Sequence, residues 1–256
     1  MLKHHTTTQL YTLDSECITL NNTSIRQQQF NYIYEKRLWG SNSRSGPGST
    51  YEGAFDWIKY LTQIVPQYNI SSIADIPCGD TYWQFGVREI NTIAFYFGGD
   101  IASALIEKNQ YLYQLHQNKL FQYWDIVQCE LPTFSFRNIT KQSFDLVIVR
   151  DAIQHMSIKN GLRAVKNVVL SGAKYFAVSS YPAPCVEKIC AVRNIVDGGF
   201  YHNNINCPPF NFPINATIFK QPSHSQFKSE KDEFHMYKID DILKQIVKQY
   251  DKACMA

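Results

Sequence analysis

The stretch that decides the predicted fold is Ile70-Ser-Ser-Ile-Ala-Asp-Ile-Pro-Cys-Gly-Asp80. A short apolar run ends in an acid and breaks into a tight turn, and residues 82–90 then have a helical pattern, so the order is strand, loop, helix. A nucleotide-binding α/β domain begins in this way, and its ligands bind outside the carboxyl ends of the strands. Gly79 would let backbone and ligand approach closely there, and Asp75 would accept hydrogen bonds. A buried strand followed by an ordinary turn is the alternative interpretation.

The next apolar run agrees with the nucleotide-binding interpretation. Residues 93–97 have the length of a strand and lead into Gly98-Gly-Asp100-Ile101. Asp75 and Asp100 then end two successive strands, 25 residues apart with a helix between them. The acid that ends the second strand of such a domain is placed to accept hydrogen bonds from both ribose hydroxyls. Because the G-x-G-x-x-G fingerprint is absent, the pattern favours an adenosine ligand that lacks a pyrophosphate.

Further strands continue the predicted sheet. Residues 120–126 form a third strand that ends in Asp125, which is placed to meet an adenine amino group. Residues 143–151 contain the unbroken apolar run of a central strand that is covered on both faces, and they end in Arg150 and Asp151. A helix over 158–170 and a strand over 174–180 complete five strand–helix units.

The segments around this core differ in texture. Residues 1–28 are polar without a sustained period, which predicts a loose or partly ordered arm without a site. Helices are expected over 29–38 and 50–64. The loop between them contains Ser45-Gly-Pro-Gly-Ser49, which is either a helix–helix connection or a lid over a ligand. The single expected domain, 29–256, divides into a helical lid region (29–66), a cofactor-binding core (70–180), an aromatic and Asn-rich insertion that builds a substrate pocket (181–215), and a closing hairpin with a terminal helix (216–256).

Composition and charge narrow the classes of function. With 256 residues and 45% hydrophobic content, the chain has enough apolar material for one large α/β domain. A formal charge of +3 without a dense Lys/Arg cluster argues against a nucleic-acid partner. No apolar run is long enough to span a bilayer, and the first eight residues lack a signal-peptide core. A soluble, cytoplasmic protein without a membrane partner is therefore expected.

Cysteine and asparagine positions carry little further information at this level. The cysteines are seven in number and irregularly spaced, so neither a disulfide framework nor a zinc or other metal site is expected. Cys185, Cys190 and Cys207 fall in one predicted loop region and would be neighbours, although paired sulfurs there would be a surprise. Five N-x-Ser/Thr sequons, at Asn21, Asn22, Asn69, Asn138 and Asn215, are explained by the general richness of the chain in Asn.

With these motifs in place, the chain resembles class I S-adenosylmethionine-dependent methyltransferases. It is similar to one group of them, which has a first turn of the pattern D-x-P-C-G-D, a preceding S-G-P-G-S loop and a late P-F-N-F-P stretch. The matching residues here are Asp75 to Asp80, Ser45 to Ser49 and Pro209 to Pro213. The similarity covers roughly residues 30–240, with the motifs in the right order. It implies a Rossmann-like α/β fold, with a mostly parallel seven-stranded sheet, helices on both faces and an antiparallel C-terminal hairpin.

The resemblance also implies an activity. Members of this group use S-adenosyl-L-methionine, and some viral relatives act on sugar hydroxyls of glycans, so O-methylation of a small-molecule or carbohydrate hydroxyl is expected. The group usually has Trp-Arg where this sequence has Phe200-Tyr201, so the contact that this Arg would make with an acidic or sugar group lacks its residue here. Two alternatives are a catalytically silent module that keeps the fold and a nucleic-acid methyltransferase, which would need a basic stripe.

The predicted site residues follow from the strand ends and from the resemblance. Those predicted to bind the cofactor are Ser45, Gly46, Asp75, Pro77, Cys78, Gly79, Asp80, Trp83, Gly99, Asp100, Ile101, Asp125, Ile126, Arg150 and Asp151. Those predicted to contact the substrate are Tyr201, Asn204 and Asn211. His155 is the first candidate for a general base because imidazole groups titrate near neutrality, and Asp151 and His202 are the other candidates. A histidine bonded to backbone at a helix start is the alternative for His155, and an ordinary loop residue is the alternative for His202.

Overall fold

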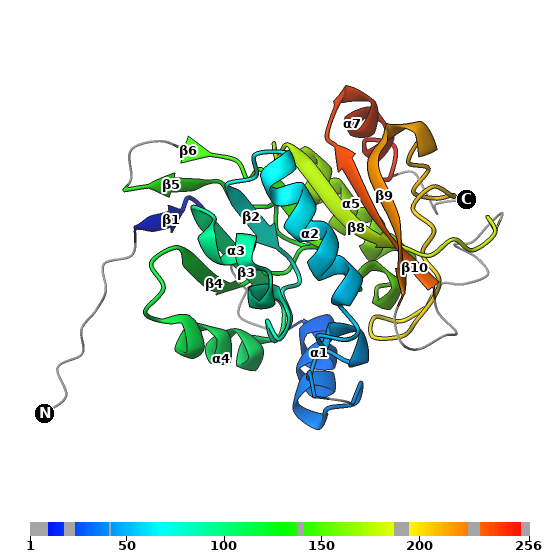
Figure 1. The fold of residues 1–256 in the computed structure, drawn as a ribbon. Helices are drawn as coiled ribbons and strands as arrows, with labels where there is room; N and C mark the ends of the chain where they lie inside the picture. The colour runs from blue at the N-terminus through cyan, green and yellow to red at the C-terminus, as the bar shows by residue number, and fades with distance from the viewer. Residues whose placement is uncertain are drawn as a thin grey trace, which may run out of the picture.

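The computed structural model describes residues 10–17, 24–40, 42–137, 141–186, 195–224 and 231–251 of the chain. Its centre is a seven-stranded sheet in the order β4-β3-β2-β7-β8-β10-β9 (Figure 1). Neighbours from β4 to β8 pair in parallel, whereas β10 pairs antiparallel with β8 and with β9. The mostly parallel sheet with an antiparallel C-terminal hairpin is therefore confirmed.

The strands are β1 (Tyr11–Leu13), β2 (Ser72–Asp75), β3 (Phe95–Asp100), β4 (Lys119–Tyr123), β5 (Phe134–Phe136), β6 (Lys141–Gln142), β7 (Leu146–Val149), β8 (Tyr175–Ser180), β9 (Thr217–His224) and β10 (Lys231–Lys238). The helices are α1 (Ile25–Lys36), α2 (Phe55–Gln67), α3 (Arg88–Thr92), α4 (Ser103–Tyr113), α5 (Ile158–Leu170) and α7 (Asp241–Val247).

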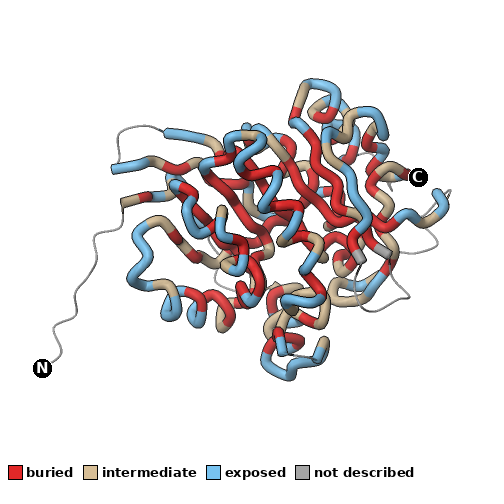
Figure 2. The backbone as a smooth tube through the Cα atoms, in the orientation of Figure 1, coloured by how far each residue is buried: buried red, intermediate tan, exposed pale blue. Residues whose placement is uncertain are grey.

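Helices cover both faces of this sheet, as predicted. Successive strand residues point to opposite faces, so Ala74 and Phe97 join the hydrophobic cluster of α5 and α7, whereas Ile73 and Tyr96 join that of α2, α3 and α4. Figure 2 shows the resulting continuous burial along the central strands. Burying one large apolar side chain stabilises a fold by about 1.5–3 kcal/mol. Since helices cover both faces of the central strands, side chains on either face gain this stabilisation, which explains why these strands are apolar without interruption.

The parallel strands end at one edge of the sheet, which is where the motif residues gather. β2 and β7 are neighbours at the middle of the sheet, and the chain continues from β2 to β3 on one side and from β7 to β8 on the other. Such a reversal of strand order opens a crevice outside the carboxyl ends of the strands. Figure 1 shows α1 lying outside this edge. The turns after β2, β3 and β7 therefore face a common region near α1.

Within the segment predicted to be a loose or partly ordered arm, residues 10–17 and 24–28 are ordered. β1 pairs antiparallel with β5, which pairs with β6 in a small second sheet. Tyr11 stacks on Phe95 with ring centroids 4.4 Å apart, and Cys17 is bonded to Cys129. α1 begins at Ile25, after Ser24 caps its first turn. The polar composition hid this order because the stabilising contacts are with residues far along the chain.

The structure also corrects the expectation that the cysteines are unpaired. Cys17–Cys129 joins residues with a sequence separation of 112, and Cys185–Cys207 joins residues with a separation of 22. Neither pairing follows from local spacing, because each brings together two different segments of the fold. Cys78 is a buried free thiol, and Cys190 and Cys254 lie outside the described residues.

Several element boundaries differ from the prediction, among them α1, which spans Ile25–Lys36 where 29–38 was expected. α2 continues through Pro66 to Gln67, where an earlier end was expected. The helix expected over 82–90 is a single 3-10 turn at Gln84–Gly86 followed by the short α3. β4 ends at Tyr123, so Asp125 lies in the turn after the strand. By contrast α5 has the expected bounds, since Ser157 caps it and its apolar residues recur with helical spacing.

Candidate functional site

The turn after β2 brings its backbone close to the loop before α2. Gly79 has a positive φ of 58°, and a Cβ atom there would lie 2.6 Å from Ser45 Oγ, so both the backbone conformation and the space require glycine. The Asp80 carboxylate accepts hydrogen bonds from the Ser43 hydroxyl (2.9 Å) and from the Arg44 N–H (2.8 Å). The Asp80 N–H donates to Ser45 Oγ at 3.0 Å. These bonds hold the loop against the turn, which favours the lid interpretation over a simple connection.

Two buried carboxylates end β2 and β3. Asp75 Oδ2 accepts hydrogen bonds from Gln84 Nε2 (2.9 Å) and from the Tyr96 hydroxyl (2.7 Å). Asp100 accepts the N–H of Gly79 (3.1 Å) and the N–H of Ala102 (2.9 Å). Burial raises the pKa of each carboxyl to about 6, although these hydrogen bonds act in the opposite direction. Both groups are therefore ionised at neutral pH at a cost in free energy, which a hydrogen-bond-donating ligand would offset.

The Asp75→Asn variant is expected to be more stable than the wild type at neutral pH. Asparagine keeps an oxygen that accepts from Gln84 and Tyr96 but carries no charge. The folded-state pKa of about 6 lies above the unfolded value of ~3.9, so the wild type loses stability as the pH rises from about 4 to about 6. Urea denaturation should give the variant an advantage of about 2–3 kcal/mol in unfolding free energy at about pH 7.5, and almost none at about pH 4. The same advantage at both pH values would contradict a buried ionised carboxylate at this position.

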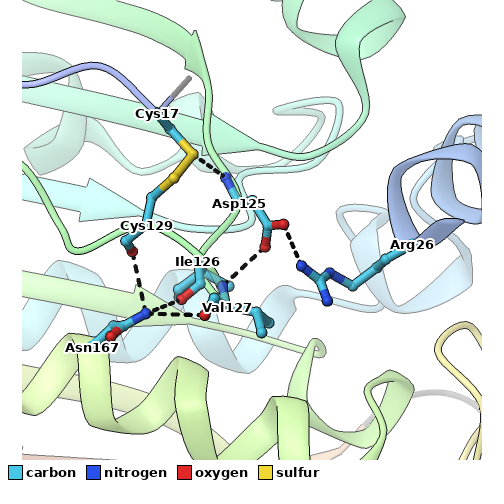
Figure 3. Close-up of a disulfide and its surroundings, with 7 residues drawn as sticks. All are labelled: Cys17, Arg26, Asp125, Ile126, Val127, Cys129 and Asn167. Atoms are coloured by element: carbon cyan, nitrogen blue, oxygen red, sulfur yellow. Dashed lines mark hydrogen bonds and ion pairs between the residues drawn. A yellow bond between two sulfur atoms is a disulfide. The ribbon is translucent and has the colours of Figure 1, made fainter. Parts of the chain in front are cut away.

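Asp125 is held from three sides in the turn after β4 (Figure 3). Its carboxylate forms an ion pair with Arg26 of α1 and accepts the Val127 N–H at 3.0 Å, and its own N–H donates to the Cys17 sulfur at 3.2 Å. The Cys17–Cys129 disulfide ties the N-terminal segment to the same turn. Arg26 thus belongs to the site, although no site residue was predicted before residue 29. No local signal identifies it, since it lies 99 residues from its partner in the sequence.

Arg150 connects the end of β7 to the loop before α2. Its Nη2 donates to the carbonyl oxygens of Gly48 (2.7 Å) and Gly53 (3.3 Å) and forms an ion pair with Asp151 Oδ2 at 3.1 Å. The guanidinium group also lies over the Trp83 ring, 5.2 Å from its centroid. Arg150 is therefore a positioning residue, which holds the loop over the strand end through two backbone contacts.

His155 lies in a 3-10 turn (Ile153–His155) after β7. Its Nδ1 is 2.7 Å from the Gly199 carbonyl oxygen. Because a carbonyl oxygen only accepts, Nδ1 donates, and Nε2 of the neutral ring carries the lone pair. The ring packs against Trp39 and Phe200, with centroids 4.8 and 5.7 Å away. His155 thus has the backbone hydrogen bond that is typical of a structural histidine. It also has the tautomer that a general base needs.

The turns after β2, β3, β4 and β7 line a first cavity, which opens to solvent. Most of the residues predicted to bind the cofactor line it. These are Ser45, Asp75, Pro77, Cys78, Gly79, Trp83, Asp100, Ile101, Asp125, Ile126, Arg150 and Asp151. Its wall also contains buried polar atoms without a hydrogen-bond partner among the described residues, namely Arg26 Nε, Gln84 Oε1 and Arg150 Nε. Unpartnered buried polar atoms favour a polar ligand in this cavity.

A second cavity of about 1040 Å³ adjoins the first. Five residues line both cavities and mark their junction: Trp39, Ser45, Arg150, Asp151 and His155. The rest of the second cavity is formed by Leu38, Gly46, Pro47, Gly48, Gly53, Gln154, Tyr181, Phe200 and Asp232. A group bound in one cavity would therefore meet a group bound in the other beside two of the predicted catalytic residues.

Three residues predicted to bind the cofactor lie outside the first cavity. Gly46 lines the second cavity, and Asp80 is used in holding the loop. Gly99 is buried within β3, where a Cβ atom would lie 2.8 Å from Trp124 Cβ. Its carbonyl oxygen accepts the Cys78 N–H at 2.9 Å. Gly99 therefore supports the first turn from behind.

The residues predicted to contact the substrate lie outside these two cavities, and Tyr201 and Asn204 line a smaller third one. Tyr201 is buried in the core, and Asn204 donates to the Ala183 carbonyl oxygen at 2.7 Å. Asn211 is exposed in a turn with a positive φ of 54°. His202 packs on Phe200 and does not reach the junction. The insertion contributes Phe200 and Tyr181 to the second cavity instead.

This sheet order, with a cavity outside the ends of β2 and β3, is the fold of class I S-adenosylmethionine-dependent methyltransferases. No protein-family model and no curated protein matches the chain. Among solved structures, magnesium protoporphyrin IX methyltransferase (ChlM) from Synechocystis PCC 6803 matches with a TM-score of 0.57 and 12% identity, over 86% of this chain and 98% of that one. N-methyltransferase NodS from Bradyrhizobium japonicum WM9 matches with a TM-score of 0.58 and 12% identity, over 82% of this chain and 99% of that one. At these identities the likeness shows the fold, and membership of the narrower group stays a prediction.

Proposed function

We propose that the protein is an S-adenosyl-L-methionine-dependent methyltransferase that methylates a hydroxyl group of a small molecule or carbohydrate. The first cavity is the observation that carries this proposal. It lies outside the carboxyl ends of β2 and β3, where two buried carboxylates and the Gly79 turn converge. The Synechocystis structure was solved with bound S-adenosylmethionine and with bound S-adenosylhomocysteine, and NodS was solved with S-adenosylhomocysteine.

The residues of the first cavity fit this cofactor. Asp100 would accept hydrogen bonds from the ribose hydroxyls, Asp125 from the adenine amino group, and the Gly79 turn would face the methionine part. The hydrogen bonds already present leave room for these contacts, because a carboxylate has about four lone-pair sites. The unpartnered Gln84 Oε1 and Arg26 Nε supply a further acceptor and a further donor.

The proposed mechanism uses the junction of the two cavities. S-adenosylmethionine supplies a methyl group that its sulfonium already activates, so the chain has to orient the acceptor and remove its proton. Nε2 of His155 would accept the hydroxyl proton while the Gly199 carbonyl oxygen keeps Nδ1–H oriented. Asp151 lies at the same junction, where its Oδ1 accepts from Gln154 Nε2 at 3.3 Å. Asp151 would then hold the acceptor by a hydrogen bond.

The His155→Ala variant is expected to lose turnover and to keep its affinity for the cofactor. Positioned acid–base groups contribute about 10²- to 10⁴-fold, so kcat should fall by that range. The dissociation constant of S-adenosylhomocysteine, measured by calorimetry, should change by less than about threefold. His202→Ala is the matched control, since His202 lies outside both cavities and its loss should leave kcat nearly unchanged. Wild-type turnover in His155→Ala would remove His155 as the base.

A transfer screen tests the activity itself. The purified protein and methyl-tritiated S-adenosylmethionine would be incubated with fractions of glycans, lipids, proteins and small molecules from cell extract. Label in the glycan or small-molecule fraction that survives alkaline hydrolysis, and so is not a methyl ester, supports an ether-forming O-methyltransferase. Cofactor binding without label in any fraction would support the silent module, and label confined to protein would sink the proposed acceptor class.

The compartment is a separate part of the proposal. The sequence predicted the cytoplasm, whereas the disulfides Cys17–Cys129 and Cys185–Cys207 favour an oxidising compartment. Within the described ranges, no helix is long and apolar enough to cross a membrane. The sequons at Asn69 and Asn215 are exposed and would be accessible in a secretory compartment.

A further inference from the structure

Asp232 is an acidic residue in the second cavity that the proposed mechanism does not use. It lies near the start of β10, which pairs antiparallel with β8, so the strand begins where the parallel strands end. This topology places Asp232 in the same cavity wall as Asp151, Tyr181 and Phe200. Asp232 is 5% exposed, so its carboxylate is removed from bulk water.

One oxygen of this carboxylate lacks a partner. The Ser223 side chain of the neighbouring strand forms a hydrogen bond to Asp232, but Oδ2 has no hydrogen-bond partner among the described residues. No described residue forms an ion pair with Asp232 either. Buried carboxylates are normally paired because an isolated buried charge is costly. A buried carboxylate with one unpartnered oxygen in a cavity wall therefore favours a hydrogen-bond-donating ligand group there.

The charged residues in the wall of the second cavity indicate the charge of the ligand group that would bind Asp232. Among the described residues that line the second cavity, Arg150 is the one permanent cation, and it is already paired with Asp151 and bonded to the Gly48 carbonyl oxygen. Within the described part of the chain, Asp232 has no ion pair of its own. Burial raises the pKa of Asp232 to about 7, with a further contribution from Asp151 that Arg150 opposes. A cationic ligand group would neutralise the Asp232 carboxylate, whereas a neutral hydroxyl group would not.

The remaining wall suits the same ligand. Trp39, Tyr181 and Phe200 contribute aromatic rings to the second cavity. Phe200 and Tyr181 lie edge to face, with centroids 5.9 Å apart. Aromatic faces attract ammonium groups, and the attraction is stronger where water is excluded. Carboxylate and aromatic rings together form the usual surroundings of a bound ammonium group.

We propose that the second cavity binds an amine-bearing acceptor, whose ammonium group pairs with Asp232 while its hydroxyl group lies at the junction beside His155. The substrate class is then an amino alcohol or an amino sugar. The inference rests on the proposed function for calling the ligand an acceptor, whereas the ammonium site itself follows from Asp232. Asp232 is a specificity-determining residue in this arrangement and takes no part in proton removal.

Binding of matched probes tests the proposal without knowledge of the natural acceptor. The probes are glucosamine and glucose, ethanolamine and ethylene glycol, and tryptamine and indole-3-ethanol, titrated into the protein with and without S-adenosylhomocysteine. At least one amine should bind the wild type about tenfold or more tightly than its neutral counterpart. In Asp232→Asn this preference should fall to about twofold or less. Asp241→Asn, which removes an exposed acid of α7, is the control and should keep the preference.

The pH dependence gives a readout that a structural role of Asp232 would not move. The groups that face Asp232 are Arg150 and Asp151 after β7, Ser223 of β9 and Tyr60 of α2, with His155 in the same cavity wall. Because the pKa of Asp232 is about 7, its ionised fraction rises about tenfold between about pH 6 and about pH 8. Affinity for ethanolamine or tryptamine, whose amines stay protonated over this range, should rise by the same factor in the wild type and stay flat in Asp232→Asn.

Equal affinity for every amine and its neutral counterpart would overturn the proposal, and so would a preference that survives in Asp232→Asn. If that variant does not fold, the wild-type preference and its pH dependence still decide. Failure of the proposed function is distinguishable. A protein that prefers amines but does not bind S-adenosylhomocysteine keeps the ammonium site and loses the methyltransferase assignment.

Discussion

Replacing Asp100 by alanine is expected to weaken the binding of S-adenosylmethionine by about 100-fold or more. This carboxylate ends β3, lines the first cavity and is buried. A hydrogen bond to a charged group contributes about 1.5–3 kcal/mol, so losing two ribose contacts costs about 3–6 kcal/mol. Calorimetric titration with S-adenosylhomocysteine measures the loss directly and needs no acceptor.

Controls separate this effect from loss of structure. Asp100 also accepts the N–H groups of Gly79 and Ala102, so its alanine variant loses some stability as well. The Asp100→Asn variant keeps one accepting oxygen and should fold better while still binding the cofactor poorly. Glu107→Gln removes an exposed acid of α4 outside the cavity and should bind as the wild type does. A folded Asp100→Ala protein with affinity within about threefold of the wild type would remove Asp100 from the site.

Loss of the Cys17–Cys129 disulfide is expected to cause a larger loss of stability than loss of Cys185–Cys207. A disulfide restricts the unfolded chain more when it closes a longer loop, and the separations are 112 and 22 residues. The chain-entropy relation gives about 5 kcal/mol for the longer loop and about 3.5 kcal/mol for the shorter one. Double serine variants of each pair, compared in urea denaturation without reductant, measure both losses.

The two disulfides should also differ in their effect on the cofactor. Cys17–Cys129 borders the turn of Asp125, and Asn167 of α5 supports the same turn by donating to the Ile126 carbonyl oxygen at 2.8 Å (Figure 3). The double serine variant of Cys17 and Cys129 should therefore bind S-adenosylhomocysteine more weakly than the wild type does. Cys185 and Cys207 line neither the first nor the second cavity, so their variant should keep the affinity. Equal losses of stability, or four thiols open to alkylation in the unreduced protein, would contradict this assignment.

The central part of the fold was predictable because its signals are local. The apolar run Leu146 to Val149 identifies a doubly covered strand from neighbouring residues alone. Acids that follow apolar runs, such as Asp75 and Asp100, are placed at one sheet edge once the strands are parallel. Most of the residues predicted at these strand ends accordingly line one cavity. Turn chemistry added Gly79, whose positive φ the short turn requires.

In the insertion over 181–215, local sequence patterns do not show which side chains face the cavity. This insertion was expected to build a substrate pocket, and it does contribute Phe200 to the second cavity. Yet Tyr201, the next residue, points into the core, and neither composition nor periodicity separates the two in an irregular segment. Backbone bonds from distant segments, such as Gln154 O accepting the Tyr201 N–H at 3.0 Å, set which side chain faces the cavity.

The sequence by itself therefore determined the order of strands and helices around the main sheet, the two-sided burial of the central strands and the acids at their ends. Those features depend on periods of two and 3.6 residues and on turns of a few residues. Only the tertiary structure decided that Arg26 pairs with Asp125, that Cys17 joins Cys129, and that Asp232 shares a cavity wall with Asp151. Such contacts join residues far apart in the chain, because sheet topology and the direction of β10 bring their segments together, and no local pattern encodes that meeting.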